Sequence, residues 1–298
     1  MSTTSAIRDA KSAKNAAPAG PAGPAGPVGR LPSPGEISGR LGRWAADWTR
    51  EKLAIGSMPF GAVKGAVLEK GRGNRLVVRA VAEQIYYTAI EPLGVFLVIA
   101  LTIGTFAVVL SDALMRPNGL APHVPSVIAH SLVRELLPIV IAVVLIGRTG
   151  TAIATELGYM RVSDEVEALE AVGINIDYFL VLPRLLGVTL SALGLTVVLS
   201  AAALVGGFFV GDSLGMVPAG LRLHQIAQAV TPLTVAFALG KSSLFGLMIS
   251  SINCFHGLAV GRVFTDIPRA NVRGALQCYL ACFLLNAALS LAALYLTL

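Results

Sequence analysis

The stretch Gly147–Pro183, GRTGTAIATELGYMRVSDEVEALEAVGINIDYFLVLP, decides how this chain is organised. It is polar and acidic, and long apolar runs flank it on both sides. Residues 80–298 hold 12 Asp and Glu residues, and six of them fall in this stretch: Glu156, Asp164, Glu165, Glu167, Glu170 and Asp177. An acidic segment kept on one side of a membrane-embedded chain indicates a surface that meets a soluble partner.

The composition places the chain in a bilayer. Of its 298 residues, 55% are hydrophobic and 13% are charged, whereas a soluble domain carries about 25% charged residues. Apolar runs near the length of a membrane-spanning helix recur along the chain. The sequence therefore predicts an all-α membrane protein with an interfacial N-terminal helix and five transmembrane helices. We expect the spans at about residues 89–110, 127–146, 185–210, 231–254 and 275–298.

The charge is distributed unevenly. Residues 1–79 hold 13 Lys and Arg against 5 Asp and Glu, a net charge of +8, although the whole chain carries only +6. A basic segment next to membrane spans favours anionic lipid over nucleic acid, so we expect no nucleic-acid partner. The positive-inside rule then predicts a cytoplasmic N-terminus, a cytoplasmic acidic segment and, with five spans, an external C-terminus.

The N-terminal part divides in two before the membrane domain at 81–298. Residues 1–35 are rich in Pro, Ala and Gly, which predicts a disordered tail. Residues 36–80 are basic, and Leu41, Trp44, Ala45 and Trp48 recur at helical spacing, which predicts an amphipathic helix in the headgroup layer. The alternative is a helix packed on a soluble partner.

A short helix is predicted inside the acidic stretch. Ser163 can cap its N-terminus, Asp164 and Glu165 suit its first turn, and Gly173 can end it, so the helix covers residues 164–172. An apolar stripe is formed by Val162, Val166 and Leu169, with Val172 beside it, while Glu167 and Glu170 lie on other faces. Such a helix can dock in a groove of another protein. The alternative, a helix resting on the membrane, is disfavoured by its acids because the inner leaflet is negative.

Three charged residues fall inside the predicted spans: Arg134, Glu135 and Lys241. Such residues are costly in lipid and usually face a cavity or one another. Glu135 lies about 18 Å from Gly147 along its helix, and Lys241 about 22 Å from His256, at 1.5 Å per residue. The two side chains should lie near the same depth, which suggests a Glu135–Lys241 ion pair. Alternatively, each could pair locally and serve only the fold.

Catalytic and metal-binding motifs are absent from the sequence. Gly240-Lys241-Ser242 resembles the end of a P-loop, but Val235 occupies the position of its first glycine. The four histidines form neither an HExxH motif nor a cluster of metal ligands. We therefore expect no catalytic residue, no metal and no cofactor in this chain.

The stretch from Arg134 to Gly187 resembles the signature region of the MlaE/YrbE family, the permease subunits of MCE-associated ABC lipid transporters. The residues that carry this resemblance are Arg134-Glu135, Pro138, Gly147-Arg148, Gly150, Ala154, Glu156, Gly158, Met160-Arg161, Glu165, Gly173 and Pro183-Arg184. Lys241-Ser242 with Phe245, His256-Gly257, and Arg269-Ala270 with Arg273 extend it. The resemblance covers about residues 79–298 and makes 81–298 an MlaE-type permease domain.

The resemblance implies a lipid transporter subunit of the inner membrane that works as a homodimer, with Mg-ATP bound by a partner ATPase. The helix at 164–172 would be a coupling helix in a groove of a cytoplasmic ABC ATPase, through Asp164, Glu165, Val166, Glu167, Leu169, Glu170 and Gly173. An MCE-domain lipid-binding protein would be the external partner, and a STAS-domain protein a further one. The lipid path would lie at the dimer interface, lined by Leu93, Phe96, Leu97 and Phe106, with Arg134, Glu135 and Lys241 near the cargo.

Two other functions remain open at this point. The chain could be a stand-alone secondary transporter or channel that uses Glu135 and Lys241 as a proton or ion relay. It could also be a membrane enzyme that acts on lipid headgroups.

Overall fold

The computed structural model describes residues 49, 51–65, 74–115, 117, 127–213 and 230–297. This part of the chain is helical and holds no strand. Five helices are long and apolar enough to cross a membrane: Leu93–Met115, His130–Val162, Asp177–Gly207, Pro232–Leu258 and Asp266–Ala293. The predicted all-α membrane fold with five spans is therefore confirmed. The predicted tail at 1–35 and most of the predicted amphipathic helix, residues 41–48, lie outside the described residues.

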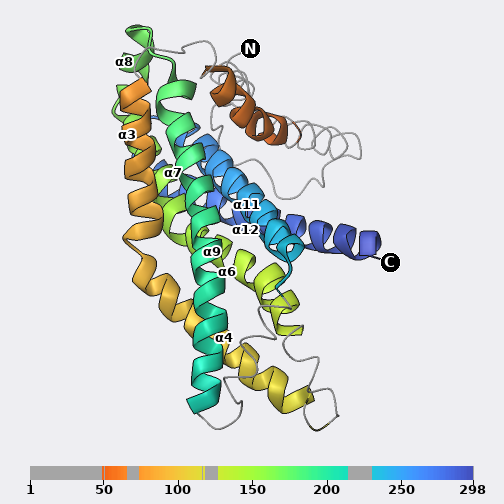
Figure 1. Ribbon diagram of the computed structural model, residues 1–298. Helices are drawn as coiled ribbons and strands as arrows, with labels where there is room; N and C mark the ends of the chain where they lie inside the picture. The colour runs from red at the N-terminus through yellow and green to blue at the C-terminus, as the bar shows by residue number, and fades with distance from the viewer. Residues whose placement is uncertain are drawn as a thin grey trace, which may run out of the picture.

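The first span follows a bent connection. Helix α3 (Asn74–Ile85) leads through a π-helical turn, η1 (Tyr86–Ile90), into α4 (Leu93–Met115). Arg148 fixes this bend, since its Nη1 donates to the Tyr87 carbonyl at 2.8 Å and its Nη2 lies 2.9 Å from Oε2 of Glu91. Figure 1 shows α4 running at an angle to α3 and alongside α9 (Leu182–Ser213).

Helix α4 packs closely on α9 at small residues. A Cβ added to Gly104 would overlap the Ala203 backbone, and one added to Gly207 would lie 2.7 Å from the Gly104 backbone. Small residues at a crossing let two transmembrane backbones approach, which supplies the van der Waals contact that drives helix association in lipid. Ala203 itself is fully buried there.

The second span is longer than predicted. The sequence placed its end near Ile146, but the helix continues through η3 (Ala129–Leu136), α6 (Leu137–Leu145), η4 (Ile146–Gly150) and α7 (Thr151–Val162). Its last part is polar in composition, yet packing keeps it helical: Gly158 lies against Val260 and Ile267, and Gly257 lies against Leu157. Gly158 and Gly257 are thus contact points between α7 and the segments that pack on it.

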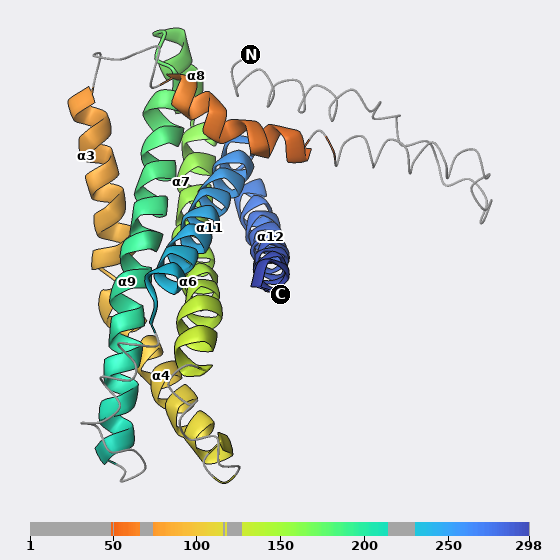
Figure 2. The same ribbon diagram turned by 45° about the vertical axis from the view of Figure 1, so that its right-hand side comes forward.

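The short helix of the acidic stretch is α8 (Glu165–Ala171), which lies at one end of the molecule (Figures 1 and 2). The expectation that Ser163 caps it is wrong. Ser163 ends α7, because its N–H bonds the Tyr159 carbonyl at 2.9 Å. The residue before α8 is Asp164, which adopts a left-handed conformation with φ 57° and makes no side-chain cap. The chain needs this conformation to reverse direction between α7 and α8.

Gly173 ends α8 as the sequence predicts. Its φ is +84°, its N–H bonds the Glu170 carbonyl at 3.0 Å, and the Ile174 N–H bonds the Leu169 carbonyl at 3.0 Å. These two bonds form a Schellman motif, in which the residue after the helix must be left-handed. The chain then returns through η5 (Asp177–Val181) into α9.

We expect Gly173→Val to weaken the end of α8. A β-branched residue in this conformation costs about 1–3 kcal/mol, which exceeds what so short a helix can absorb. Hydrogen exchange at the amides of Gly173 and Ile174 should speed up. Gly173→Asn is the control, because Asn tolerates the left-handed region and should keep exchange slow. Equal exchange in the two variants would contradict this role.

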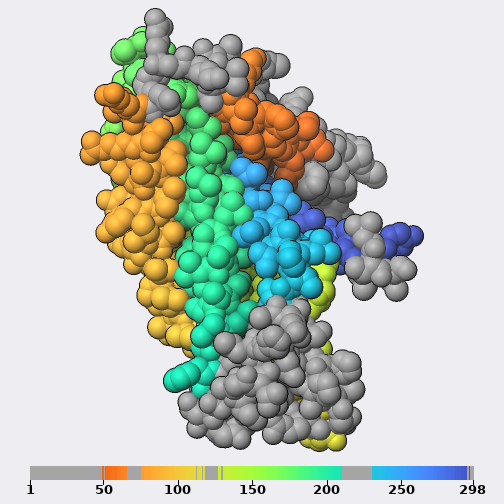
Figure 3. Space-filling view, viewed as in Figure 1, coloured from red at the N-terminus to blue at the C-terminus, as the bar shows by residue number. Residues whose placement is uncertain are grey.

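The last two spans, α11 (Pro232–Leu258) and α12 (Asp266–Thr297), form a pair that crosses α6 and α7. A helix at residues 51–65 lies across their ends on the α8 side (orange in Figures 2 and 3). Met58 and Ala62 on its inner face are fully buried. Glu51 lies 3.8 Å from Nε2 of His256 on α11, and that nitrogen lies 2.6 Å from the side-chain amide of Gln277 on α12, so His256 links the helix to the last span.

Candidate functional site

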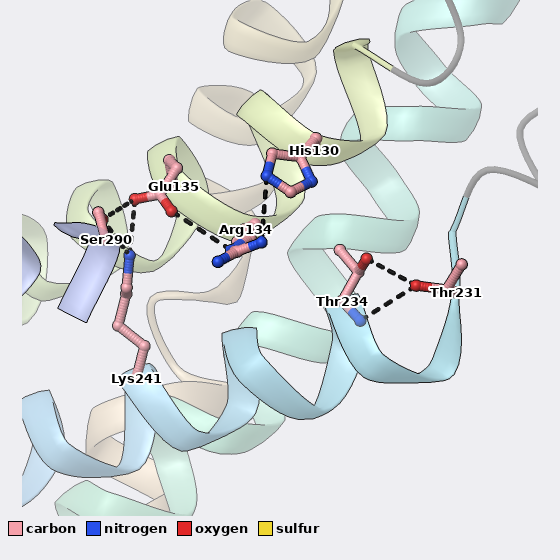
Figure 4. A network of polar contacts seen from close by, with 7 residues as sticks. All are labelled: His130, Arg134, Glu135, Thr231, Thr234, Lys241 and Ser290. Carbon is pink, nitrogen blue, oxygen red and sulfur yellow. Dashed lines mark hydrogen bonds and ion pairs between the residues drawn. The ribbon is translucent and has the colours of Figure 1, made fainter. Parts of the chain in front are cut away.

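A cluster of polar side chains lies between η3, α11 and α12 (Figure 4). Nζ of Lys241 lies 2.7 Å from Oε2 of Glu135. Ser290 on α12 lies between the two residues: its Oγ lies 2.5 Å from the same carboxylate oxygen and 3.1 Å from Nζ of Lys241. Three helices therefore meet at one carboxylate oxygen.

The same cluster extends along η3 toward His130. Arg134 lies 3.6 Å from Glu135 between Nε and Oε1, and its Nη1 lies 3.1 Å from Nε2 of His130. Its guanidinium carbon lies 4.3 Å from the ring centroid of Phe237, a cation–π distance. Arg134 and Lys241 together carry two positive charges against the single carboxylate of Glu135, so the cluster is positive by one charge.

Local sequence explains why these side chains face inward. Pro138 stands at the start of α6 and has no N–H to donate to the carbonyl of Arg134, so the normal α-helical bond cannot form there. The helix widens into the π-helical η3 at this point. Such single-turn widenings shift the faces that side chains present and are frequent at functional sites.

The charged side chains of the cluster differ in how much of their surface is exposed. The Lys241 side chain is fully buried, whereas the Glu135 side chain keeps 30% of its surface exposed and Arg134 keeps 13%. A buried ammonium is tolerated in a membrane protein only when it is paired. Lys241 therefore depends on Glu135 more than Glu135 depends on Lys241.

A second candidate region surrounds α8. Val166 is buried and Leu169 packs against the core, so the predicted apolar stripe holds α8 to its own chain. Val172, predicted beside that stripe, is 79% exposed instead. Arg161 of α7 lies 3.1 Å from Glu167 of α8, between Nη1 and Oε1, which joins the two helices. Asp164 and Glu165 are exposed, and Glu167 and Glu170 are partly buried.

A further ion pair anchors the return into the membrane. Nη2 of Arg184, at the start of α9, lies 2.8 Å from Oε1 of Glu156 in α7, and its Nη1 donates to the Leu180 carbonyl at 2.7 Å. The Arg184 side chain is 10% exposed and that of Glu156 is 61% exposed. Both residues belong to the quoted family pattern, and the structure joins them across two helices.

The four residues predicted to line a lipid path do not share one environment. Phe96 is buried inside the chain, Leu93 and Leu97 are partly buried against the core, and Phe106 is 67% exposed. Their role stays a prediction. Ser290, His130 and Phe237 were not predicted as site residues. Ser290 could have been noticed as a hydroxyl within the apolar run of the last span.

The described residues offer no group of three or more His, Cys, Asp or Glu side chains that could hold a metal ion. The three cysteines, Cys254, Cys278 and Cys282, are buried free thiols. The two regions described above are thus the chemically distinctive parts of this fold.

Comparison with known proteins extends the resemblance. The family described as "Permease MlaE" matches residues 81–292. A "Probable ABC transporter permease protein" of Synechocystis is 30% identical over 222 residues, 74% of this chain and 83% of its own length. A similarly named protein of Rickettsia bellii is 30% identical over 147 residues, 49% of this chain and 57% of its own. The chloroplastic protein TRIGALACTOSYLDIACYLGLYCEROL 1 of Arabidopsis thaliana is 25% identical over 211 residues, 71% of this chain and 60% of its own length.

The family match spans the region that holds the five membrane helices, the polar cluster and α8. It covers more than two thirds of the chain and leaves out only the N-terminal segment and the last few residues. The chain therefore belongs to the MlaE permease family.

Proposed function

We propose that this chain is the membrane-spanning subunit of an ABC transporter that moves phospholipid or a related lipid at the inner membrane. A separate ATPase subunit would dock on α8 and supply the energy. The observation that carries this proposal is α8 itself, a short helix held rigidly outside the spans. It is held by Val166, by the Arg161–Glu167 ion pair and by the Schellman motif at Gly173.

Movement of α8 has a direct route into the membrane. It is joined to α7, and α7 is the end of the same continuous helix that carries Glu135. The Glu156–Arg184 pair joins α7 to the start of α9. An ATPase that binds two states of α8 with different affinity would therefore shift the polar cluster and the third span together.

The polar cluster supports an anionic cargo. Its net positive charge and its position among apolar helices suit the phosphate of a lipid headgroup. The name of the Arabidopsis relative contains the name of a galactolipid, which supports lipid as the class of cargo. An MCE-domain protein on the external side, and a STAS-domain protein on the cytoplasmic side, are further partners that we propose from family membership.

The lipid path and the dimer are proposed on the basis of burial. The first and fifth spans are the least covered by the rest of the chain, with 22% and 11% of their most apolar stretches buried. A second copy packed along α12 would cover exposed side chains such as Leu280, Phe283 and Leu284. The orientation with a cytoplasmic N-terminus and external C-terminus belongs to the same proposal.

The test is recovery of an ABC-type ATPase with the tagged full-length chain in mild detergent. Val172 is 79% exposed at the end of α8, so Val172→Asp should leave the fold intact and reduce ATPase recovery about tenfold, as expected for a lost apolar contact worth about 1.4 kcal/mol. Val172→Ile is the matched control and should retain the ATPase.

Recovery of the wild-type chain with no ATPase would overturn the proposed function. The remaining candidate would then be a secondary transporter or channel, because Glu135 and Lys241 form a direct pair within the membrane. Ion flux through vesicles that contain the chain alone would be the measurement for that candidate.

A further inference from the structure

An exposed apolar patch lies one helical turn before the end of α7. We define the loop patch as Tyr159 of α7 together with Val263 and Phe264 of the loop between α11 and α12. Their exposed fractions are 53%, 54% and 56%, and the ring centroids of Tyr159 and Phe264 lie 5.8 Å apart. Figure 2 shows α11 and α12 meeting toward the end of the molecule that carries α8.

The loop patch is preformed. Val260 and Ile267, on either side of it, are buried at 3% and 4% exposure, and both lie against Gly158 of α7. Two turns close the loop, because the Asp266 N–H bonds the Val263 carbonyl at 3.0 Å and the Ile267 N–H bonds the Phe264 carbonyl at 3.2 Å. A partner that binds there would pay little for ordering the loop.

The loop patch stands beyond the lipid headgroups. Arg148 and Arg273 are the last charged residues before the apolar parts of their spans, so we take them as the inner edge of the hydrocarbon. Tyr159 lies 11 residues past Arg148 in one continuous helix, about 16 Å along its axis. The headgroup layer is only about 5–8 Å thick on each side. Exposed aromatic rings at this level face the cytoplasm and suit a protein rather than lipid.

Helix α8 alone is too small to hold an ATPase. It has seven residues, and Val166 and Leu169 are used for packing against the chain itself. A stable protein interface uses about 20–30 residues and about 800 Å² on each side. More surface at this end of the molecule is needed, and the loop patch is a rigid, exposed and aromatic part of it.

We propose that the loop patch is a second docking element for the ATPase subunit, which grips α8 and the α11–α12 loop together. The inference rests on the proposed function. The charges of the two elements differ: Asp164 and Glu165 are exposed at α8, while Arg262 and Arg269 are exposed around the loop. Arg269 lies 3.6 Å from Asp266, so these three loop residues carry one net positive charge. A partner with basic residues facing α8 and acidic residues facing the loop would bind in one orientation only.

The inference has a mechanical consequence. Through the loop, the ATPase would contact the junction of α11 and α12, the two helices that carry Lys241 and Ser290. Through α8, it would contact the helix that carries Glu135. One partner would thus hold all three helices of the polar cluster at their cytoplasmic ends.

The experiment measures binding of the purified ABC-type ATPase to the full-length chain in nanodiscs. Phe264→Ser and Tyr159→Ser should each weaken binding about tenfold or more, because exposed aromatic anchors dominate such interfaces. Phe60→Ser is the matched control, since Phe60 is 79% exposed on the helix at 51–65 and should bind as the wild type does.

A second measurement separates protein from lipid as the occupant. The cysteine of Phe264→Cys should react with a membrane-impermeant maleimide, because position 264 is exposed. The native cysteines are buried and should not react, so the labelling reports this position alone. Addition of the ATPase should protect the new cysteine. Protection by anionic lipid but not by the ATPase would overturn the inference. The inference would also be overturned if Phe264→Ser and Tyr159→Ser bound the ATPase within twofold of the wild-type affinity while Val172→Asp lost binding. The proposed function would still stand in that case. Absence of binding by the wild-type chain would overturn both.

Discussion

Glu135→Gln is expected to abolish the proposed transport and to lower the free energy of unfolding by about 3 kcal/mol, because it leaves the fully buried ammonium of Lys241 without its carboxylate. Lys241 is fully buried, and its Nζ contacts both Glu135 and Ser290. Glutamine keeps the size and shape of glutamate, so packing around η3 should change little. Thermal unfolding in detergent is one measurement, and the proposed lipid transfer in vesicles that contain the chain with its ATPase is the other.

The double variant Glu135→Gln with Lys241→Met separates structure from transport. Removal of both charges should return part of the lost stability, since no buried ammonium remains, although Arg134 still lacks the carboxylate that lies 3.6 Å from it in the wild type. If stability returns and transport does not, the charges act on the cargo. If both return, the pair serves only the fold. A single variant as stable as the wild type would contradict direct pairing, and so would a charge swap, Glu135→Lys with Lys241→Glu, that restores no stability.

Gly104→Ala is expected to push α4 away from α9 and to destabilise the protein by about 2 kcal/mol, within the usual cost of overpacking. The added Cβ would overlap the Ala203 backbone, which cannot move aside as a flexible side chain could. The first span is little buried elsewhere, so its attachment to the bundle depends on this crossing. Thermal unfolding in detergent is the readout.

Gly94→Ala is the matched control for Gly104→Ala. Both glycines lie in α4, but a Cβ on Gly94 would meet nothing within 4 Å. This variant should unfold at the wild-type temperature or slightly above it, because alanine favours helix over glycine by about 1 kcal/mol. Equal destabilisation of the two variants would contradict a role for close packing at Gly104, because helix propensity alone would stabilise both of them.

The sequence predicts the number of spans because length and hydropathy are enough to identify a membrane helix. It does not predict where those helices end. The stretch from Thr151 to Val162 carries polar and charged side chains, yet it stays helical because glycines let α7, α11 and α12 pack closely. Tertiary packing of this kind leaves no periodic signal in one segment alone.

Depth within the membrane could be predicted, but lateral position could not. The rise per residue is constant, so counting residues from the span ends placed Glu135 and Lys241 at one level, in agreement with their 2.7 Å contact. Which helices face each other at that level depends on how the bundle is assembled, so Ser290 was missed. The cap at Ser163 was misjudged because the left-handed turn at Asp164 has no glycine to mark it.

The helix at residues 51–65 imposes an order on folding. It leaves the ribosome before any span, yet its contacts are Tyr178 and Asn175 near Gly65, and His256 near Glu51. Some 200 residues must be synthesised before the last of these appears, which takes roughly 10–40 s at about 5–20 residues per second. Until His256 has been made the helix cannot form all of these contacts, although Met58 and Ala62 on its apolar face are fully buried in the final fold. The membrane surface is the apolar phase within reach, so this segment can wait there and dock last.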